Sequence, residues 1–255
     1  MLPVLAVLQA RMSSSRFPGK ILVPLLGRPM LHRQIERVLR AGKITEVVVA
    51  TSTDVTDDAV ESLCRRIGIR CFRGSLEDVL DRFYCVAKAV RPQHIVRLTG
   101  DCPLADPDVI DTVIGVHLDG RFDYTSNVNP PTFPDGLDVE VLRFESLETA
   151  WKEATLPSER EHVTSFIRNH PERFSTFNVA SGRDLSQLRW TVDEPDDLQF
   201  VERVYSLLLP QESFFSMNHV LRLLEVHPEI QEINASHRRN EGYLRSLEKD
   251  GRLVP

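Results

Sequence analysis

Short apolar runs alternate with amphipathic segments in the first part of this chain. The apolar runs are too brief for helices and end in polar or turn residues, which is typical of buried strands, and they cover residues 3–8, 46–51, 70–72 and 94–98. Between them, apolar residues recur at helical spacing on one face of residues 30–41, 57–67 and 76–90. Strands separated by helices predict an α/β fold with a doubly wound, mostly parallel sheet and right-handed crossovers.

The segment that follows the first strand is basic and contains no acid. Arg11, Arg16 and Lys20 can donate charge-assisted hydrogen bonds, and the small serines at 13–15 let backbone amides approach oxygen atoms. Ligands of doubly wound sheets bind at the carboxyl ends of strands, where this loop lies. The loop therefore favours a nucleoside triphosphate, with an ordinary basic βα loop as the alternative. It matches neither GxxxxGK[ST] nor GxGxxG, which disfavours P-loop and dinucleotide-binding proteins.

Two aspartates follow strand-like segments that are far apart in the sequence. Asp101 lies in a Thr-Gly-Asp turn after the fourth strand, and Asp193 follows an apolar segment, 188–192, that we expect to be a late strand. One or two carboxylates together with substrate phosphates suit Mg²⁺. The alternatives are a turn cap for Asp101 and, for Asp193, the N-cap of a helix to about residue 209, with Asp196 completing an imperfect capping box.

The alternation of strands and helices breaks at residues 122–145. Residues 122–127 are strand-like, 129–136 are rich in turn residues, and 137–142 alternate with period two, which places Asp138 and Glu140 on one face. These acids either bind sugar hydroxyls or face water. We favour the solvated face, because charged side chains are mostly exposed.

Two further segments of the second half of the chain read as helical. Residues 158–161, Ser-Glu-Arg-Glu, form a capping box that predicts a helix to about residue 169 and gives Glu161 a structural role. For His162 we favour packing or exposure over metal binding, because no second His or Cys stands at ligand spacing. Residues 217–248 predict two or three covering helices.

Composition limits the class of protein. A chain of 255 residues forms one large domain or two small ones, and a net charge of −6 disfavours a nucleic-acid surface. No apolar segment has membrane-spanning length and the first residues lack the features of a signal peptide, so we expect a cytoplasmic protein. The four cysteines show no CxxC spacing and are expected to be reduced and structural.

Seven segments, in order through nearly the whole chain, resemble the spore-coat polysaccharide cytidylyltransferase family. This family is a branch of the acylneuraminate and 3-deoxy-manno-octulosonate cytidylyltransferases. The segments are residues 9–20, 26–31, 72–82, 97–104, 136–141, 161–164 and 189–193.

The resemblance implies one nucleotidyltransferase domain over residues 1–255, with the nucleotide-diphospho-sugar transferase fold of the GT-A, Rossmann-like type. Residues 122–145 would form a β-arm for dimerisation or substrate contact, and residues 211–255 a helical extension. The implied reaction transfers CMP from CTP to a sugar, such as a nonulosonic acid, and releases pyrophosphate. The implied cofactor is Mg²⁺, and the implied assembly is a homodimer that binds neither nucleic acid nor membrane.

The resemblance also implies the roles of particular residues. Arg11, Lys20 and Asp101 would be catalytic, and Asp101 with Asp193 would hold Mg²⁺. Asp138, Glu140 and His162 would line the sugar side. The residues implied to bind the nucleotide are Gln9, Ala10, Arg11, Met12, Ser13, Ser14, Ser15, Arg16, Lys20, Gly74, Ser75 and Thr99.

Two departures from the sialate branch leave alternatives open. A serine triplet replaces its glycine-containing loop, and Thr-Gly-Asp replaces its glutamine-containing turn, so an enzyme that uses GTP or UTP and a non-catalytic nucleotide-binding module both remain. In the implied mechanism a sugar hydroxyl attacks the α-phosphorus in line, and no side-chain general base is required. We expect Lys20→Ala to abolish transfer with the fold intact, on the premise that a loop cation is not a core residue.

Overall fold

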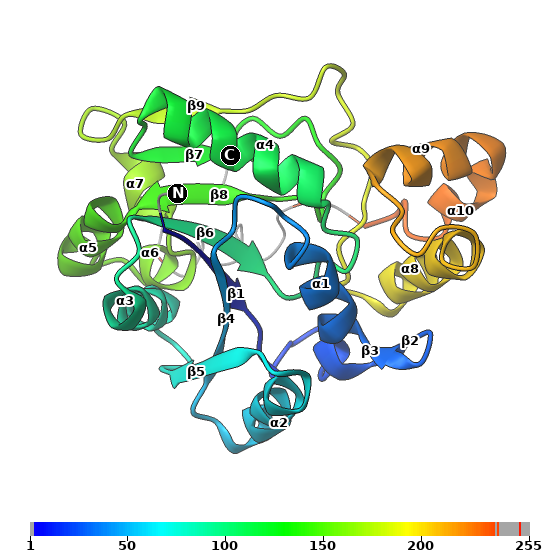
Figure 1. Ribbon diagram of the computed structural model, residues 1–255, viewed down its shortest axis with the longest axis horizontal. Coiled ribbons are helices and arrows are strands. Elements are labelled where there is room, and N and C mark those ends of the chain that lie inside the picture. The colour runs from blue at the N-terminus through cyan, green and yellow to red at the C-terminus, as the bar shows by residue number, and fades with distance from the viewer. Residues whose placement is uncertain (1–2, 238, 240–249, 251–255) are drawn as a thin grey trace.

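The computed structural model describes residues 3–237, 239 and 250. Seven strands of this part of the chain form one sheet in the order β5-β4-β1-β6-β8-β7-β9 (Figure 1). Neighbours from β5 to β6 pair in parallel, as do β7 and β9, whereas β8 is antiparallel to both β6 and β7. The strands are β1 Val4–Gln9, β4 Glu46–Ser52, β5 Arg70–Gly74, β6 His94–Thr99, β7 Tyr124–Ser126, β8 Glu140–Arg143 and β9 Thr176–Asn178. The predicted mostly parallel α/β sheet is confirmed.

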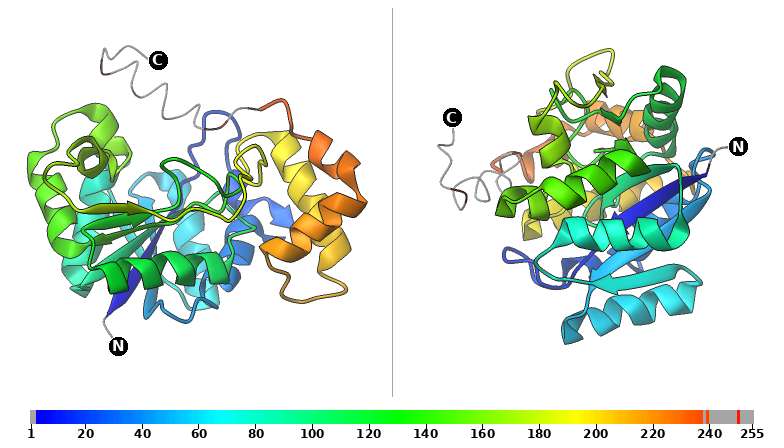
Figure 2. Two further views of the ribbon diagram at one scale, coloured as in Figure 1. Left: turned by 90° about the horizontal axis from the view of Figure 1, so that it is seen from above. Right: turned by 90° about the vertical axis from the view of Figure 1, so that its left-hand side faces the viewer.

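Helices cover both faces of the sheet (Figure 2). Ala6 and Leu8 of β1 point into a core shared with α1 Met30–Val38, α2 Asp58–Ile67 and α4 Pro107–Gly120. Leu5 and Val7 point the other way, into a core shared with three further helices, α3 Val79–Val90, α5 Phe144–Glu153 and α7 Ser165–Asn169. The doubly wound arrangement therefore follows from the alternation of side chains along buried strands.

The C-terminal helices lie beside α1 and extend the first core (Figure 1). They are α8 Pro195–Leu208, α9 Met217–Val226 and α10 Pro228–Glu232. The prediction of helices in the tail is confirmed up to Glu232, whereas residues 238 and 240–248 of the predicted range lie outside the described residues. Within the described part of the chain, none of the helices combines the length and apolar composition needed to cross a membrane.

Two helices of the structure, α4 and α5, have no counterpart in the sequence predictions. The start of α4 has a recognisable signal, because Asp106 precedes Pro107 and its carboxylate accepts hydrogen bonds from the amides of Asp108 and Val109. The helix pattern was also present, since Val109, Ile110, Val113 and Ile114 recur at helical spacing and are buried together.

The prediction of a late strand at 188–192 is wrong. These residues hydrogen-bond with a turn instead of a strand: the Asp135 amide donates to Leu188, and the Trp190 amide donates to Asp135. The backbone of Arg189 pairs with that of Asp135 as an isolated β-bridge. Gly136 permits this close approach, because its φ is +108° and a Cβ there would lie 2.6 Å from the backbone of residues 190–191.

The single helix predicted from residue 158 to 169 is two short helices, α6 Pro157–Glu161 and α7. The chain breaks between them at Val163, whose φ is +50°. The capping box at Ser158 is also wrong, because α6 begins at Pro157 after Leu156, and the buried Ser158 hydroxyl has no partner among the described residues. Pro157 suits the first helical position because its missing N–H would be unpaired there.

Two short strands, β2 Pro24–Leu25 and β3 Arg28–Pro29, form a separate hairpin. A 3₁₀ turn, η1 Lys20–Leu22, leads into it, and a second, η2 Val55–Asp57, precedes α2. Residues 122–145 supply β7 and β8, and β8 lies between β6 and β7. This segment is therefore part of the main sheet.

Candidate functional site

A cavity of about 710 Å³ opens at the edge of the sheet where β1 and β6 end. Gln9 and Thr99 are the last residues of those strands, and Glu140 begins the antiparallel β8 at the same edge. The sequence-predicted residues that line the cavity are Gln9, Ala10, Arg11, Ser13, Ser14, Ser15, Arg16, Lys20, Thr99, Asp101, Asp138, Glu140, His162 and Asp193.

Three predicted residues, Met12, Gly74 and Ser75, do not line this cavity. The Met12 amide donates a 2.7 Å hydrogen bond to a carboxylate oxygen of Asp57, and the Met12 side chain packs against the core. Asp57 is itself buried, and its other oxygen accepts from the Ser52 amide at 2.9 Å. A buried carboxylate therefore ties the basic loop to the end of β4.

Lys20 joins the two aspartates that the sequence predicted to converge. Its Nζ donates to Asp101 Oδ2 at 3.1 Å, to Asp193 Oδ1 at 2.7 Å and to the Val192 carbonyl at 2.7 Å. Gly19, with a φ of +74°, directs the chain into η1 so that Lys20 enters the site. We call Lys20, Asp101 and Asp193 the lysine cluster.

In the lysine cluster, pairing with opposite charges shifts the pKa values more than burial does. Burial opposes the charged form of Lys20, yet Asp101 and Asp193 raise its pKa above the usual value. Burial likewise opposes the Asp101 carboxylate, yet Lys20 and Thr99 lower its pKa to about 2. Lys20 is only 6 % exposed, so the premise that this loop cation lies outside the core is wrong.

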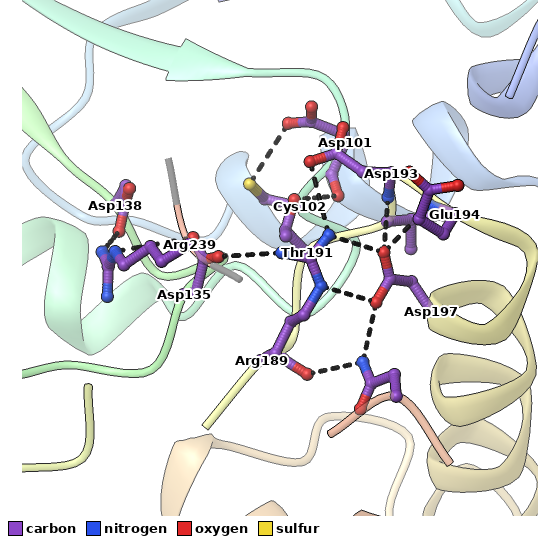
Figure 3. A network of polar contacts seen from close by, with 12 residues as sticks. Asp101, Cys102, Asp135, Asp138, Arg189, Thr191, Asp193, Glu194, Asp197 and Arg239 are labelled. Atoms are coloured by element: carbon purple, nitrogen blue, oxygen red, sulfur yellow. Dashed lines mark hydrogen bonds and ion pairs between the residues drawn. The ribbon is translucent and has the colours of Figure 1, made fainter. Parts of the chain in front are cut away.

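Asp193 faces the cavity because another aspartate caps the helix behind it (Figure 3). Asp197 accepts from the amides of Asp193 and Glu194, each at 2.9 Å, and receives two 2.8 Å hydrogen bonds from Arg189. The N-cap of α8 is Glu194, which forms a capping box with Asp197, so the prediction of Asp193 with Asp196 is wrong. The side chain of Asp193 instead contacts Lys20 and, at 2.8 Å, Arg16.

Glu140 is buried instead of solvent-facing, so the favoured solvated interpretation is wrong. Its carboxylate accepts 2.6 Å hydrogen bonds from the hydroxyls of Tyr124 and Thr164 and forms an ion pair with Arg97. Burial opposes its charge, but Arg97 and these hydroxyls lower its pKa to about 2. Glu140 therefore holds Arg97 at the cavity wall.

Asp138 precedes β8, lines the cavity with a partly exposed side chain, and contacts Arg239 (Figure 3). Arg239 donates to Asp138 at 2.5 Å and to the Phe133 carbonyl at 3.0 Å, and its Nε lies 3.7 Å from Asp135. Burial raises the pKa of Asp138, and burial with the nearby Asp138 raises that of Asp135 to about 7. We call Arg97, Asp135, Asp138, Glu140 and Arg239 the β8 cluster.

His162 and Glu161 both line the cavity, at the break between α6 and α7. Burial and Arg97 lower the pKa of His162 to about 4, so its imidazole is neutral at pH 7. Glu161 lies 3.9 Å from Arg11. The capping role expected for Glu161 is therefore wrong. Among the described residues, no group of three or more His, Cys, Asp or Glu side chains has the arrangement of a metal site.

Sequence reasoning missed several cations that line the cavity. Arg97 had a usable signal, because an arginine inside an otherwise apolar strand needs a buried partner. Arg82 ends the family-like segment 72–82, in which only Gly74 and Ser75 were singled out, whereas Arg168 and Arg239 lie in a helix and the tail, where charged residues are common and no motif marks them. The missed cations are Arg82, Arg97, Arg168 and Arg239.

The four cysteines are free, as expected. Cys102 is buried beside Asp101, and burial raises the pKa of its thiol well above the usual value. A thiol that stays protonated at neutral pH is a poor nucleophile, which agrees with a structural role.

Comparison with known proteins places most of the chain in one family. The profile described as "Cytidylyltransferase" matches residues 5–229. The spore coat polysaccharide biosynthesis protein SpsF of Bacillus subtilis is 38% identical over 214 residues, which is 79% of this chain and 86% of that protein.

Solved structures share the fold. A cytidylyltransferase from Leptospira borgpetersenii superposes with a TM-score of 0.88 at 32% identity, over 93% of this chain and 100% of the other. A CMP:2-keto-3-deoxy-manno-octonic acid synthetase, solved in complex with CTP, superposes with a TM-score of 0.61 at 22% identity, over 81% of this chain and 100% of the other.

Proposed function

Because the chain belongs to the cytidylyltransferase family, as its seven motifs predicted, we propose that it transfers CMP from CTP to a sugar and releases pyrophosphate. The family is one of nucleotidyltransferases, and the similarity to SpsF supports a role in the biosynthesis of a surface polysaccharide. A nonulosonic acid or a related sugar is the proposed acceptor.

The observation that carries this proposal is the lysine cluster. Two aspartates separated by 92 positions meet one cation of the basic loop at the wall of a cavity. Its volume of about 710 Å³ lies within the range of about 300–1,000 Å³ that small-molecule sites occupy. The contact of Lys20 with both aspartates arises only when the chain folds. An aspartate that merely capped its own turn would not need such a contact.

The donor set fits a divalent cation of the magnesium type. Asp101 and Asp193 offer two carboxylates at the cavity wall, and Mg²⁺ is usually held by one or two carboxylates together with substrate phosphates and water. A bound ion would supply charge neutralisation at the α-phosphate and would lower the pKa of a coordinated sugar hydroxyl. We propose Asp101 and Asp193 as its ligands.

The chain's own residues would bind and orient the reactants. Arg11, Arg16 and Lys20 offer cations to the triphosphate, and Lys20 would balance the charge that develops on the leaving pyrophosphate. Gln9, Ala10, Thr99 and the serines of the loop would complete the nucleotide site. The barrier falls mainly because the sugar hydroxyl is held in line with the α-phosphorus.

The β8 cluster and His162 would form the acceptor end. Asp138 offers a partly exposed carboxylate that accepts hydrogen bonds from sugar hydroxyls, and Arg97, held by Glu140, offers a cation. The neutral His162 can donate or accept a hydrogen bond there. We propose one domain, a homodimer and a cytoplasmic location, of which light scattering of the purified protein tests the dimer.

Pyrophosphate release tests the proposed function. The protein is incubated with Mg²⁺, one of the four ribonucleoside triphosphates, and each member of a panel of nonulosonic acids and neutral sugars. We expect release with CTP and one class of sugar, and a new cytidine-monophosphate sugar by mass spectrometry. Binding of CTP without release from any sugar would leave a non-catalytic nucleotide-binding module, and release with GTP or UTP alone would contradict CTP as the donor.

A further inference from the structure

Arg82 is a buried cation at the cavity that makes no direct contact with a carboxylate of the described residues. The residue is 1 % exposed and lies on α3 among buried apolar side chains. Its nearest opposing charges, Asp57 and Asp78, act on it only from beyond ion-pair distance, and its Nε has no hydrogen-bond partner among the described residues. Its Nη1 donates to the Ser75 carbonyl at 2.6 Å. Burial and the nearby Arg11 lower its pKa to about 10, so it stays charged at neutral pH.

Other cations of the same cavity are neutralised. Lys20, Arg97 and Arg239 each contact a carboxylate directly. Arg11, which repels Arg82, has its carboxylate neighbour Glu161 only at 3.9 Å. Arg11 and Arg82 are therefore the less closely compensated pair of cations on this wall.

The end of β5 is shaped to hold the Arg82 side chain. A Cβ on Gly74 would lie 3.1 Å from Arg82 Cγ and 3.1 Å from the Phe72 ring, so glycine at this position leaves room for the arginine stem. Asp78 caps α3 by accepting from the Asp81 amide, which fixes the turn that carries Arg82. Gly74 and Ser75 thus contact the nucleotide site through Arg82.

We infer that Arg82, together with Arg11, binds the terminal phosphates of the nucleotide and retains them as the leaving pyrophosphate. This inference rests on the proposed function. A buried charge without a partner is costly, and a neutral base, ribose or sugar hydroxyl would not compensate two adjacent cations. A polyphosphate compensates both and accepts several guanidinium hydrogen bonds.

The inference is tested by nucleotide affinity as a function of phosphate number. CTP, CDP and CMP are titrated by calorimetry into the wild-type protein and Arg82→Met, with Mg²⁺ and without sugar. We expect Arg82→Met to weaken CTP binding about 10- to 100-fold and CMP binding less than about twofold, because only charge-assisted hydrogen bonds to the terminal phosphates are lost. Arg82→Lys should recover part of the CTP affinity.

Lys88→Met is the matched control. Lys88 is an exposed cation on the same helix and lies outside the cavity lining, so its removal changes the net charge equally. It should change the affinities for CTP and CMP by less than about twofold. Equal losses of CTP affinity in Lys88→Met and Arg82→Met would show a general charge effect and would overturn the inference.

Ligand-free stability separates binding from structure. Replacing a buried unpaired charge by an apolar side chain of similar length should leave the urea midpoint unchanged or raise it. A lower midpoint with an unchanged ratio of CTP to CMP affinity would assign Arg82 a structural role and overturn the inference. Equal weakening of CTP and CMP would do the same, because it would place Arg82 at the base or ribose.

Pyrophosphate itself distinguishes the inference from the proposed function. If the wild-type protein binds pyrophosphate, loses this binding in Arg82→Met and does not bind CTP, the proposed function is contradicted, whereas the phosphate site at Arg82 is supported. Wild-type protein that binds CTP no better than Arg82→Met would contradict the anion site alone.

Discussion

The lysine cluster and the β8 cluster occupy the same cavity but are built differently. In the lysine cluster, two aspartates share one cation from a short basic loop, and the remaining cations of that loop stay close to it in sequence. In the β8 cluster, the two cations come from different segments of the chain, as Arg97 of β6 meets Glu140 and Arg239 of the tail meets Asp138. A loop that concentrates several cations predicts a site from sequence, whereas cations that come from separate segments do not.

The first test of this comparison is Lys20→Ala, for which we expect the largest effect. The proposed role of Lys20 in binding and leaving-group stabilisation predicts a loss of turnover of about 10³-fold or more. Asp101 would lose its cation, whereas Asp193 would keep Arg16, so we also expect the free energy of unfolding to fall by about 3 kcal/mol. Pyrophosphate release and urea unfolding measure the two effects, and unchanged turnover would remove Lys20 from the mechanism.

Asp101→Asn is expected to have the next largest effect. The loss of one of two carboxylates should raise the Mg²⁺ concentration for half-maximal rate by about tenfold or more. The titration is run in parallel on Asp138→Asn, whose carboxylate lies in the β8 cluster. If both variants require the same Mg²⁺ concentration as wild type, Asp101 is a turn residue and the two clusters do not differ in metal binding.

Arg239→Met probes the β8 cluster with a smaller expected effect. Loss of the guanidinium frees Asp138 and Asp135 to move, so the KM for the sugar identified by the pyrophosphate assay should rise about tenfold. The KM for CTP should stay within about twofold, and Arg239→Lys should restore part of the sugar affinity. If the KM for CTP rose by the same factor, the β8 cluster would not be specific for the sugar, and the two clusters would not divide nucleotide and sugar binding between them.

The smallest expected effect concerns acid stability on the β8 side. His117 is fully buried, lies 3.0 Å from His94 and 3.0 Å from the Thr125 hydroxyl on β7, and burial lowers its pKa to about 3. Between about pH 6.5 and pH 3 the unfolded chain therefore binds a proton that the folded chain does not, so stability should fall as the pH is lowered.

The measurement is the free energy of unfolding in urea at pH 7, 6, 5 and 4. His117→Gln should reduce the slope of the unfolding free energy against pH by up to about 1.4 kcal/mol per pH unit, which is the slope that the uptake of one proton on unfolding produces. An identical slope in the variant and the wild type would show that His117 does not link proton binding to folding. Hydrogen exchange of β7 and α4 should rise at acid pH before that of β1 and β4.

The strands and helices of the first hundred residues were predictable because local pattern and tertiary role agree there. Short apolar runs such as residues 46–51 have no other way to bury their side chains than a central strand. The segment at 188–192 fails because it is equally apolar but packs beside a turn, against Gly136. Burial alone does not distinguish a strand from an extended segment whose partner is a loop.

The sequence by itself determined the doubly wound sheet, the family and the position of the basic loop, because apolar periodicity and concentrated charge act over a few residues. The tertiary structure alone decided which carboxylate meets which cation. It buried Lys20 between Asp101 and Asp193, turned Glu140 inward onto Arg97, and left Arg82 with no carboxylate in direct contact among the described residues. The physical reason is that ion pairing depends on distance in space, and chain separation carries no information about that distance.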